Sequence, residues 1–146
     1  GVDVFYPDGM KRVNGRVLIY DAERFDIALV TIPFNGGITP IKLASQATLT
    51  KGQRVFSAGS NGGAKPTLER TVINSLNRYE GPDNIQIDGA PAGGRSGGGL
   101  IDQNGHLIGI CNAADHKDDE GFYTHSRYIA LFMQRLGIDD LLENPR

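Results

Sequence analysis

Short runs of alternating or β-branched residues, separated by turn signals, recur along this chain and predict an all-β protein. Residues 2–6 alternate and lead into Pro7-Asp8-Gly9, where proline presets φ and glycine accepts the left-handed backbone of a tight turn. Residues 15–20 and 27–32 are rich in β-branched side chains and are expected to form two further strands. The pattern is irregular over residues 34–52, which predicts a connecting segment.

The second half of the chain predicts six strands and then a helix. The strands are expected at 54–59, 70–77, 84–88, 99–102, 106–112 and 121–125. Asn104-Gly105 separates the fourth from the fifth and is a strong hairpin signal. The last apolar residues instead recur at helical spacing and predict a helix over 126–136, which Ser126 begins and Gly137 ends. The apolar stripe of this helix is expected to be packing surface.

Composition narrows the class of protein further. The 146 residues suffice for one domain, or for one small barrel and part of another. Glycine makes up 20 residues, well above the usual share of about 7%, in keeping with a protein full of tight turns. The net charge of -2 comes from dispersed acidic and basic residues, so neither a nucleic-acid surface nor a membrane patch is expected. No apolar run approaches the roughly 18 residues of a membrane span.

Three features could suggest further chemistry, and none is expected to supply it. The one cysteine, Cys111, cannot form an intrachain disulfide, and its apolar strand predicts a buried, inert thiol. Residues 59–65 are glycine-rich but lack the Gly-Lys-Ser/Thr ending of a phosphate loop. The charged run 115–120 does not match the spacing of a calcium loop and predicts a solvated loop. The sequence therefore predicts no metal and no cofactor.

Two short stretches carry the candidate chemistry. In residues 88–101, six glycines crowd around Ser96 just before an apolar run. Such a loop is either a flexible turn before a strand or the frame of a nucleophile beside an anion-binding nest of backbone N–H groups. Upstream, Asp26 opens the apolar strand 27–32. It is either a turn residue at the strand edge or a carboxylate that orients an imidazole.

Taken together, Asp26-Ile27-Ala28-Leu29-Val30 and Gly94-Arg95-Ser96-Gly97-Gly98-Gly99-Leu100 resemble the trypsin-like (chymotrypsin-fold) serine proteases, most closely the bacterial high-temperature-requirement (HtrA), or Do-like, branch. The resemblance extends over nearly the whole chain through the order and spacing of the strands. It implies a double β-barrel with a complete second barrel, a partial first barrel and a C-terminal helix. The implied parts are residues 1–33 (partial first barrel), 34–52 (connection), 53–125 (second barrel) and 126–146 (helix and tail).

The resemblance also implies a function and a set of site residues. The activity would be hydrolysis of peptide bonds in a polypeptide substrate through an acyl-enzyme, without a cofactor, and in an extracytoplasmic or secreted protein. Ser96 would be the nucleophile, Asp26 would orient the base, and the N–H groups of Gly94 and Ser96 would form the oxyanion hole. Substrate contacts would come from Ala90, Asn112, Ala113, Ala114 and Gly121. Ala90, six residues before the serine, predicts small or aliphatic side chains before the scissile bond.

The catalytic base is missing from the expected place. The chain order in this family is His, Asp, Ser, yet residues 1–25 contain no histidine, and the three histidines present all follow the serine: His106, His116 and His125. Each of the three is expected to be structural or solvated. The simplest expectation is a chain without its N-terminal segment, inactive alone, whose open barrel edge is covered by that segment or by another copy.

Two alternatives remain open. A chain that never had a base would be a protease-fold module that binds extended peptides. The serine loop also fits the Gly-x-Ser-x-Gly elbow of an α/β-hydrolase, with Asp115, Asp118 or Asp119 and then His125 in order, although an elbow must lead into a helix. Two residues depart from the protease pattern. Arg95 stands where many trypsin-like enzymes carry an aspartate that pairs with a new N-terminus, so activation by cleavage is not expected, and Gly99 replaces a proline.

Overall fold

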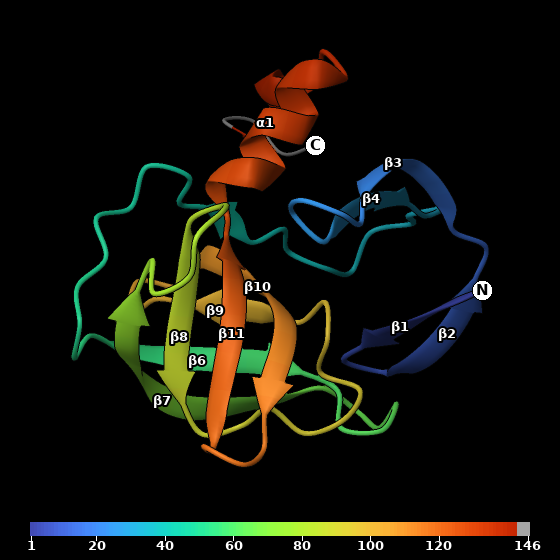
Figure 1. Ribbon diagram of the computed structural model, residues 1–146. Helices are drawn as coiled ribbons and strands as arrows, with labels where there is room; N and C mark the ends of the chain where they lie inside the picture. Colours follow the sequence, from blue (N-terminus) through green and yellow to red (C-terminus); the bar gives the residue numbers. More distant parts are fainter. Residues whose placement is uncertain (143–146) are drawn as a thin grey trace.

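A computed structural model describes residues 1–142. Its centre is a β-barrel (Figure 1) made from a sheet with the order β11-β8-β7-β6-β9-β10-β5. Because β11 pairs antiparallel with both β8 and β10, the sheet closes on itself and leaves only β5 outside the ring. The strands are β5 (Lys42–Leu43), β6 (Arg54–Gly59), β7 (Thr67–Leu76), β8 (Asn84–Asp88), β9 (Gly99–Ile101), β10 (His106–Asp115) and β11 (Glu120–His125).

Alternate residues of these strands fill the barrel. Eight buried side chains form one cluster: Val55, Ile73, Ile85, Ile87, Leu100, Ile108, Cys111 and Tyr123. Burying an aliphatic side chain of this size contributes about 1.5–3 kcal/mol, so the closed barrel holds the main apolar stabilisation of the chain. Cys111 is buried, as its apolar strand predicted, and burial raises the pKa of its thiol.

The N-terminal third forms two separate hairpins beside the barrel (Figure 1). β1 (Val2–Tyr6) pairs with β2 (Gly9–Val13), and β3 (Arg16–Asp21) pairs with β4 (Ile27–Thr31). Isolated two-stranded ribbons are marginally stable, so these hairpins depend on what they pack against. Several large apolar side chains on them are exposed: Met10, Val17, Leu18, Tyr20 and Val30.

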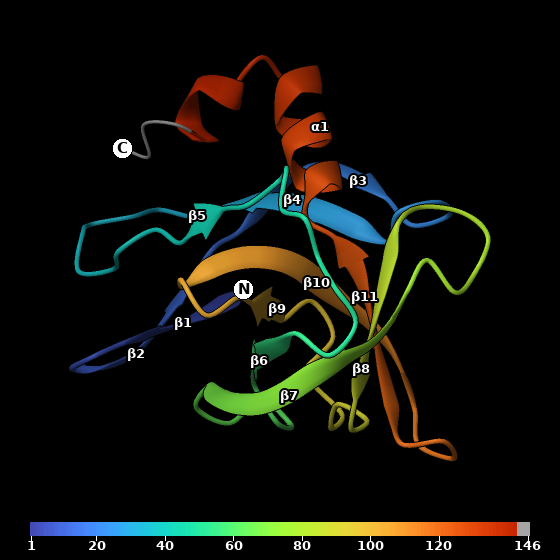
Figure 2. The same ribbon diagram turned by 90° about the vertical axis from the view of Figure 1, so that its left-hand side faces the viewer.

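A second apolar cluster joins the β3–β4 hairpin to the C-terminal helix α1 (Arg127–Arg135), which lies over β4 in Figure 2. Phe25 stacks on Tyr128 at a centroid distance of 4.5 Å and meets the fully buried Phe132 edge-on at 5.8 Å. The apolar stripe of α1 is therefore packing surface, as its spacing predicted. A short 3₁₀ turn, η1 (Asp139–Leu142), follows the helix.

The predicted strands agree with the structure most closely inside the barrel. Those at 54–59 and 84–88 have the predicted bounds, whereas β7 begins three residues earlier and β10 runs on to Asp115. Two strands were missed: β2, in which no residue is buried, and the two-residue β5 within the connection. The boundaries proposed between the two barrels and the tail remain a prediction.

The helix ends differ from the predicted capping only in detail. Ser126 does precede α1, but its hydroxyl donates to the carbonyl of Ala44 (3.2 Å) and makes no capping bond. Gly137 follows the helix with φ +68, the left-handed conformation that favours glycine at a helix end. Within residues 1–142, neither helical segment combines the length and the apolar character needed to cross a membrane.

Candidate active site

The serine loop connects β8 to β9 and is fixed to the middle of β10. Ser96 is exposed and directly follows the buried Arg95. The N–H of Gly97 donates to the carbonyl of Cys111 (2.7 Å), and the N–H of Cys111 donates to the carbonyl of Gly98 (2.8 Å). This reciprocal pair holds the backbone directly after Ser96 against β10. The loop leads into β9 and not into a helix, which contradicts the α/β-hydrolase alternative.

Gly94 takes a conformation that only glycine adopts freely. Its φ is +95°, and a Cβ at this position would lie 2.6 Å from the backbone nitrogen of Gly62. The N–H of Gly62 also donates to the carbonyl of Gly93 (2.8 Å). The loop thus packs backbone to backbone on the turn between β6 and β7, which determines how the peptide units before Ser96 are oriented.

Asp26 lies at the start of β4, next to a direct contact with the barrel. It is exposed and has a φ of +51°, which is uncommon for a residue with a side chain. The preceding carbonyl, of Phe25, accepts a hydrogen bond from the buried hydroxyl of Thr124 on β11 (3.0 Å). The side-chain amide of Asn112 on β10 in turn donates to that hydroxyl (3.2 Å).

These contacts attach two segments, seventy residues apart in sequence, to neighbouring residues of one strand. The Ser96 segment is bonded to Cys111, and the Asp26 segment is bonded through Thr124 to Asn112. Consecutive Cα atoms are only about 3.8 Å apart, so the backbone just after Ser96 and the backbone just before Asp26 are attached to the same stretch of β10.

The predicted substrate edge lies on the same strand. β9 pairs with β10 only over residues 107–110, whereas Ala113 and Ala114 pair only with β11 among the described residues. A bulge between Cys111 and Ala113 bends β10 at Asn112, and bulges of this kind often end pairing next to functional sites. Both alanines are exposed and leave one backbone edge able to accept an added strand.

The loop that carries Ala90 is tied to the turn before β11 by an interaction that the sequence did not reveal. The N–H of Ala90 donates to the carboxylate of Asp119 (2.8 Å), and the N–H of Gly89 donates to the Asp119 carbonyl (2.8 Å). Asp119 itself has a φ of +54°. Asp88 ends β8, and the acid that bonds this loop comes from the charged run 115–120.

Gly121, predicted to contact substrate, is buried against Pro91. A Cβ at Gly121 would lie 2.6 Å from the Cδ of Pro91 and 2.9 Å from the side chain of Ile87. This close approach is the reason that the position requires glycine. Its role toward a substrate, like that of Ala90, remains a prediction.

None of the three histidines hydrogen-bonds to Ser96 or Asp26 among the described residues. His106 faces Asp102, with Nδ1 to Oδ2 at 3.6 Å, and His116 is exposed in the charged loop. His125 is buried, and its Nδ1 accepts a hydrogen bond from the backbone N–H of Arg127 (3.0 Å). Burial lowers the pKa of His125, and the positive charge of Arg127 lowers it further.

Fold and site together define a trypsin-like peptidase domain. The family model described by that name matches residues 2–110, and the chain belongs to this family. Among residues 1–142, no three His, Cys, Asp or Glu side chains gather in a group that could hold a metal ion.

Individual relatives are Do-like and HtrA-type proteases, and one carries another name. The chain is 38% identical to the periplasmic serine endoprotease DegP of Salmonella typhimurium, over 62% of this chain and 20% of that protein. It is 28% identical to anti-sigma-I factor RsgI9 of Acetivibrio thermocellus, over 82% of this chain and 17% of that protein. The structure of the HtrA-type protease AlgW with a decapeptide aligns with a TM-score of 0.78 at 26% identity, covering 92% of this chain and 43% of that chain. The chain thus spans about a fifth of the curated relatives' length.

Proposed function

We propose that this chain is the serine-bearing part of an endopeptidase that cleaves polypeptides through an acyl-enzyme on Ser96. The observation that carries the proposal is the attachment of the Ser96 and Asp26 segments to adjacent residues of β10. Acyl transfer needs a nucleophile and a carboxylate that orients its base within one cleft, and a distant pair on opposite faces could not perform it.

In the proposed reaction, the Ser96 hydroxyl attacks the scissile carbonyl and gives its proton to a histidine that Asp26 orients. The N–H groups of Gly94 and Ser96 then stabilise the oxyanion, and the histidine returns the proton to the leaving amine. Water next attacks the acyl-enzyme and releases the second product. We propose that this histidine lies outside the 146 residues, because none of the three present hydrogen-bonds to the serine or the aspartate. The chain alone is then expected to be inactive or nearly so.

The proposed substrate is an extended polypeptide that adds to the free edge of β10 at Ala113 and Ala114. Ala90 offers no carboxylate for a basic side chain, so we propose small or aliphatic residues before the scissile bond. A preference for Arg or Lys in that position, measured with a peptide library on the full-length protein, would contradict this part of the proposal.

We further propose an extracytoplasmic location, since the related DegP is named as periplasmic. The exposed apolar side chains of the β1–β2 and β3–β4 hairpins indicate a surface that another segment or molecule covers. The proposed cover is another part of the full-length protein or a second copy of it. No nucleic acid or membrane partner is proposed.

A serine-directed fluorophosphonate probe on the full-length protein tests the proposal. Labelling that disappears in Ser96→Ala supports it, and Ser60→Ala is the matched control because Ser60 lies in the β6–β7 turn and outside the serine loop. Labelling that persists in Ser96→Ala, or cleavage that survives the substitution, would contradict it.

The second candidate is a peptide-binding module without catalysis, favoured by two observations. The sequence has no histidine before Asp26, and a relative that aligns over 82% of this chain is named an anti-sigma factor. No fluorophosphonate labelling of the full-length protein, together with retained binding of extended peptides that Ala113→Pro abolishes, would select this function.

A further inference from the structure

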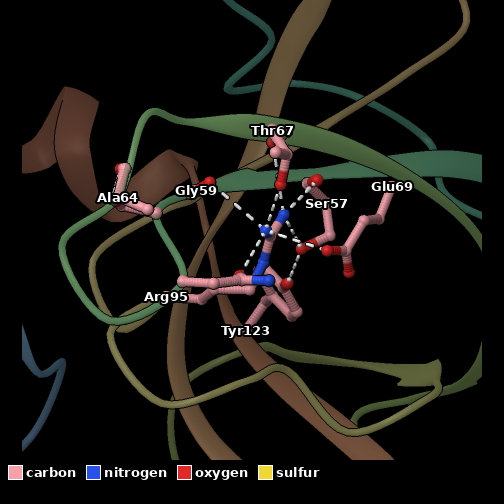
Figure 3. A network of polar contacts seen from close by, with 9 residues as sticks. Ser57, Gly59, Ala64, Thr67, Glu69, Arg95 and Tyr123 are labelled. Atoms are coloured by element: carbon pink, nitrogen blue, oxygen red, sulfur yellow. Dashed lines mark hydrogen bonds and ion pairs between the residues drawn. The ribbon is translucent and has the colours of Figure 1, made fainter. Parts of the chain in front are cut away.

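Arg95, the residue directly before Ser96, points into the barrel. Its side chain is only 1% exposed, although arginine is almost never fully buried unless it is paired. Figure 3 shows the guanidinium held between the end of β6 and the start of β7. It donates to the following acceptors: the carbonyl of Ser57 (2.6 Å), the side chains of Asn61 and Thr67 (2.9 Å each), and the carbonyl of Gly59 and the carboxylate of Glu69 (3.2 Å each).

The acceptors are mostly fixed groups, which makes this site rigid. Two are backbone carbonyls at the end of β6, and Thr67 begins β7. The one carboxylate, on Glu69, is 51% exposed, so backbone dipoles as well as an ion pair compensate the buried charge. The hydroxyl of Ser57 is also bonded to the buried Tyr123 (2.7 Å), which extends the network to β11.

The backbone of Arg95 transmits this anchoring to the serine loop. Its N–H donates to the carbonyl of Ala92 (3.1 Å), and its carbonyl accepts from the N–H of Gly98 (2.8 Å). Arg95 also fits directly on Gly59, where a Cβ would lie 3.4 Å from the Cβ of the arginine. The loop is therefore fixed on two sides, by the arginine on the β6–β7 hairpin and by Cys111 on β10.

We propose that Arg95 is a positioning residue that holds the serine loop in the form in which the N–H groups of Gly94 and Ser96 converge. This inference rests on the proposed function, because those two N–H groups form the proposed oxyanion hole. Arg95 lies between them, so its side chain fixes both flanking peptide units from inside the barrel. The acceptors of the Arg95 side chain lie on β6, on β7 and in the turn between them, so the anchor of the serine loop is built into the barrel.

A merely structural arginine would also stabilise the barrel, and the two roles differ in what they change. Loss of barrel stability lowers the fraction of folded enzyme and leaves the kinetics of the folded molecules unchanged. Loss of loop positioning lowers kcat with KM unchanged, because the oxyanion contacts form in the transition state. It also lowers the affinity for a peptide boronic acid, which mimics the transition state, in proportion to the loss in kcat/KM.

The test compares Arg95→Met and Arg95→Lys with Arg70→Met in the full-length protein. Arg70 lies on β7 beside Glu69, is exposed, and its side chain makes no hydrogen bond or ion pair with any described residue, so it is a matched control. Cleavage of a fluorogenic peptide with alanine before the scissile bond and inhibition by the corresponding boronic acid give the kinetics. Hydrogen exchange of residues 92–98 reports loop order independently of activity.

For Arg95→Met we expect kcat to fall by about 10²-fold or more, the loss seen when one oxyanion donor is removed. Exchange of the loop amides should accelerate by about tenfold or more while the amides of β10 keep their protection. For Arg95→Lys, both kcat and loop exchange should lie between those of the wild type and Arg95→Met. An ammonium group keeps the charge but cannot reach all the acceptors as the planar guanidinium does. Unchanged loop exchange in Arg95→Met, or a rise in KM with kcat intact, overturns the inference.

The exchange measurement separates failure of this inference from failure of the proposed function. If the wild-type protein neither cleaves peptides nor labels, the enzyme proposal fails, and loop exchange alone then decides whether Arg95 positions the loop. If Arg95→Met does not fold, the variants Asn61→Ala and Thr67→Val are used in its place. Each of them removes one acceptor of the Arg95 side chain. Faster loop exchange in both variants supports the inference, and unchanged exchange in both overturns it.

Discussion

Replacing Thr124 by valine removes the link between Asp26 and the barrel with almost no change in shape. The threonine hydroxyl is buried, donates to the carbonyl of Phe25 (3.0 Å) and accepts from the amide of Asn112 (3.2 Å). A net hydrogen bond contributes about 0.5–1.5 kcal/mol, and a buried partner left unsatisfied costs about 1–3 kcal/mol. We therefore expect Thr124→Val to lower the free energy of unfolding by about 1–3 kcal/mol.

The effect on catalysis should exceed what this loss of stability explains. In this variant the carbonyl of Phe25 loses its hydrogen-bond donor, and Asp26 is the next residue in the chain. A misplacement of about 1 Å in a catalytic group can lower the rate by about 10²-fold. We expect kcat/KM of the full-length enzyme to fall by 10 to 10²-fold under conditions in which the variant stays folded. Thr48→Val is the control, because Thr48 is exposed and its hydroxyl makes no hydrogen bond within residues 1–142.

A double-mutant cycle with Asp26→Asn decides whether the threonine acts through the aspartate. Asp26→Asn alone should lower kcat by about 10⁴-fold, the loss seen when this carboxylate is replaced in a serine triad. If Thr124 positions Asp26, then Thr124→Val should have little further effect in the Asp26→Asn background. Additive losses in the double variant would refute the connection through β10, as would unchanged kcat/KM in Thr124→Val.

Three further predictions concern separate parts of the molecule. Asp119→Ala should free the loop that carries Ala90, raising KM for peptide substrates and accelerating hydrogen exchange at residues 89–90, whereas unchanged exchange would show that the Asp119 bond is dispensable. His125 has a lowered pKa in the folded state, so the unfolded chain binds the proton more readily. The free energy of unfolding should therefore fall by up to about 1.4 kcal/mol per pH unit as the pH drops below about 6.5. Urea titrations at several pH values should show a weaker dependence of this free energy on pH in His125→Gln than in the wild type. Gly94→Ala should cost about 1–3 kcal/mol of stability and abolish fluorophosphonate labelling, because φ is +95° and the methyl group would meet the backbone of Gly62; a variant with normal thermal stability would contradict this geometry.

Much of the barrel could be predicted from local pattern. β6 has the predicted bounds because alternating residues bury one face of the strand, and this periodicity is visible without neighbours. β8 also has the predicted bounds, although residues 85–87 are buried in succession. The fold class is confirmed for the same reason, together with the family resemblance of the two motifs. β2 and β5 were missed, since β2 buries almost nothing and β5 has only two residues.

Which segments would meet could not be read from the pattern. Thr124 and Asp119 are ordinary strand and loop residues by sequence, and their importance comes from partners 99 and 29 positions away. Arg95 was recognised only as a departure from a motif, because its burial depends on carbonyl groups of β6 and side chains of β7 that surround it.

The sequence by itself determined most of the barrel strands, the glycine-rich loop around Ser96, the acid directly before β4 and the membership of a trypsin-like family, because all of these lie in residue type and short-range spacing. Only the tertiary structure decided that the serine and aspartate segments attach to adjacent residues of β10, and that an arginine inside the barrel anchors the loop. The physical reason is that a hydrogen bond depends on where two groups lie in space, and only tertiary packing brings groups this far apart in the chain within about 3 Å.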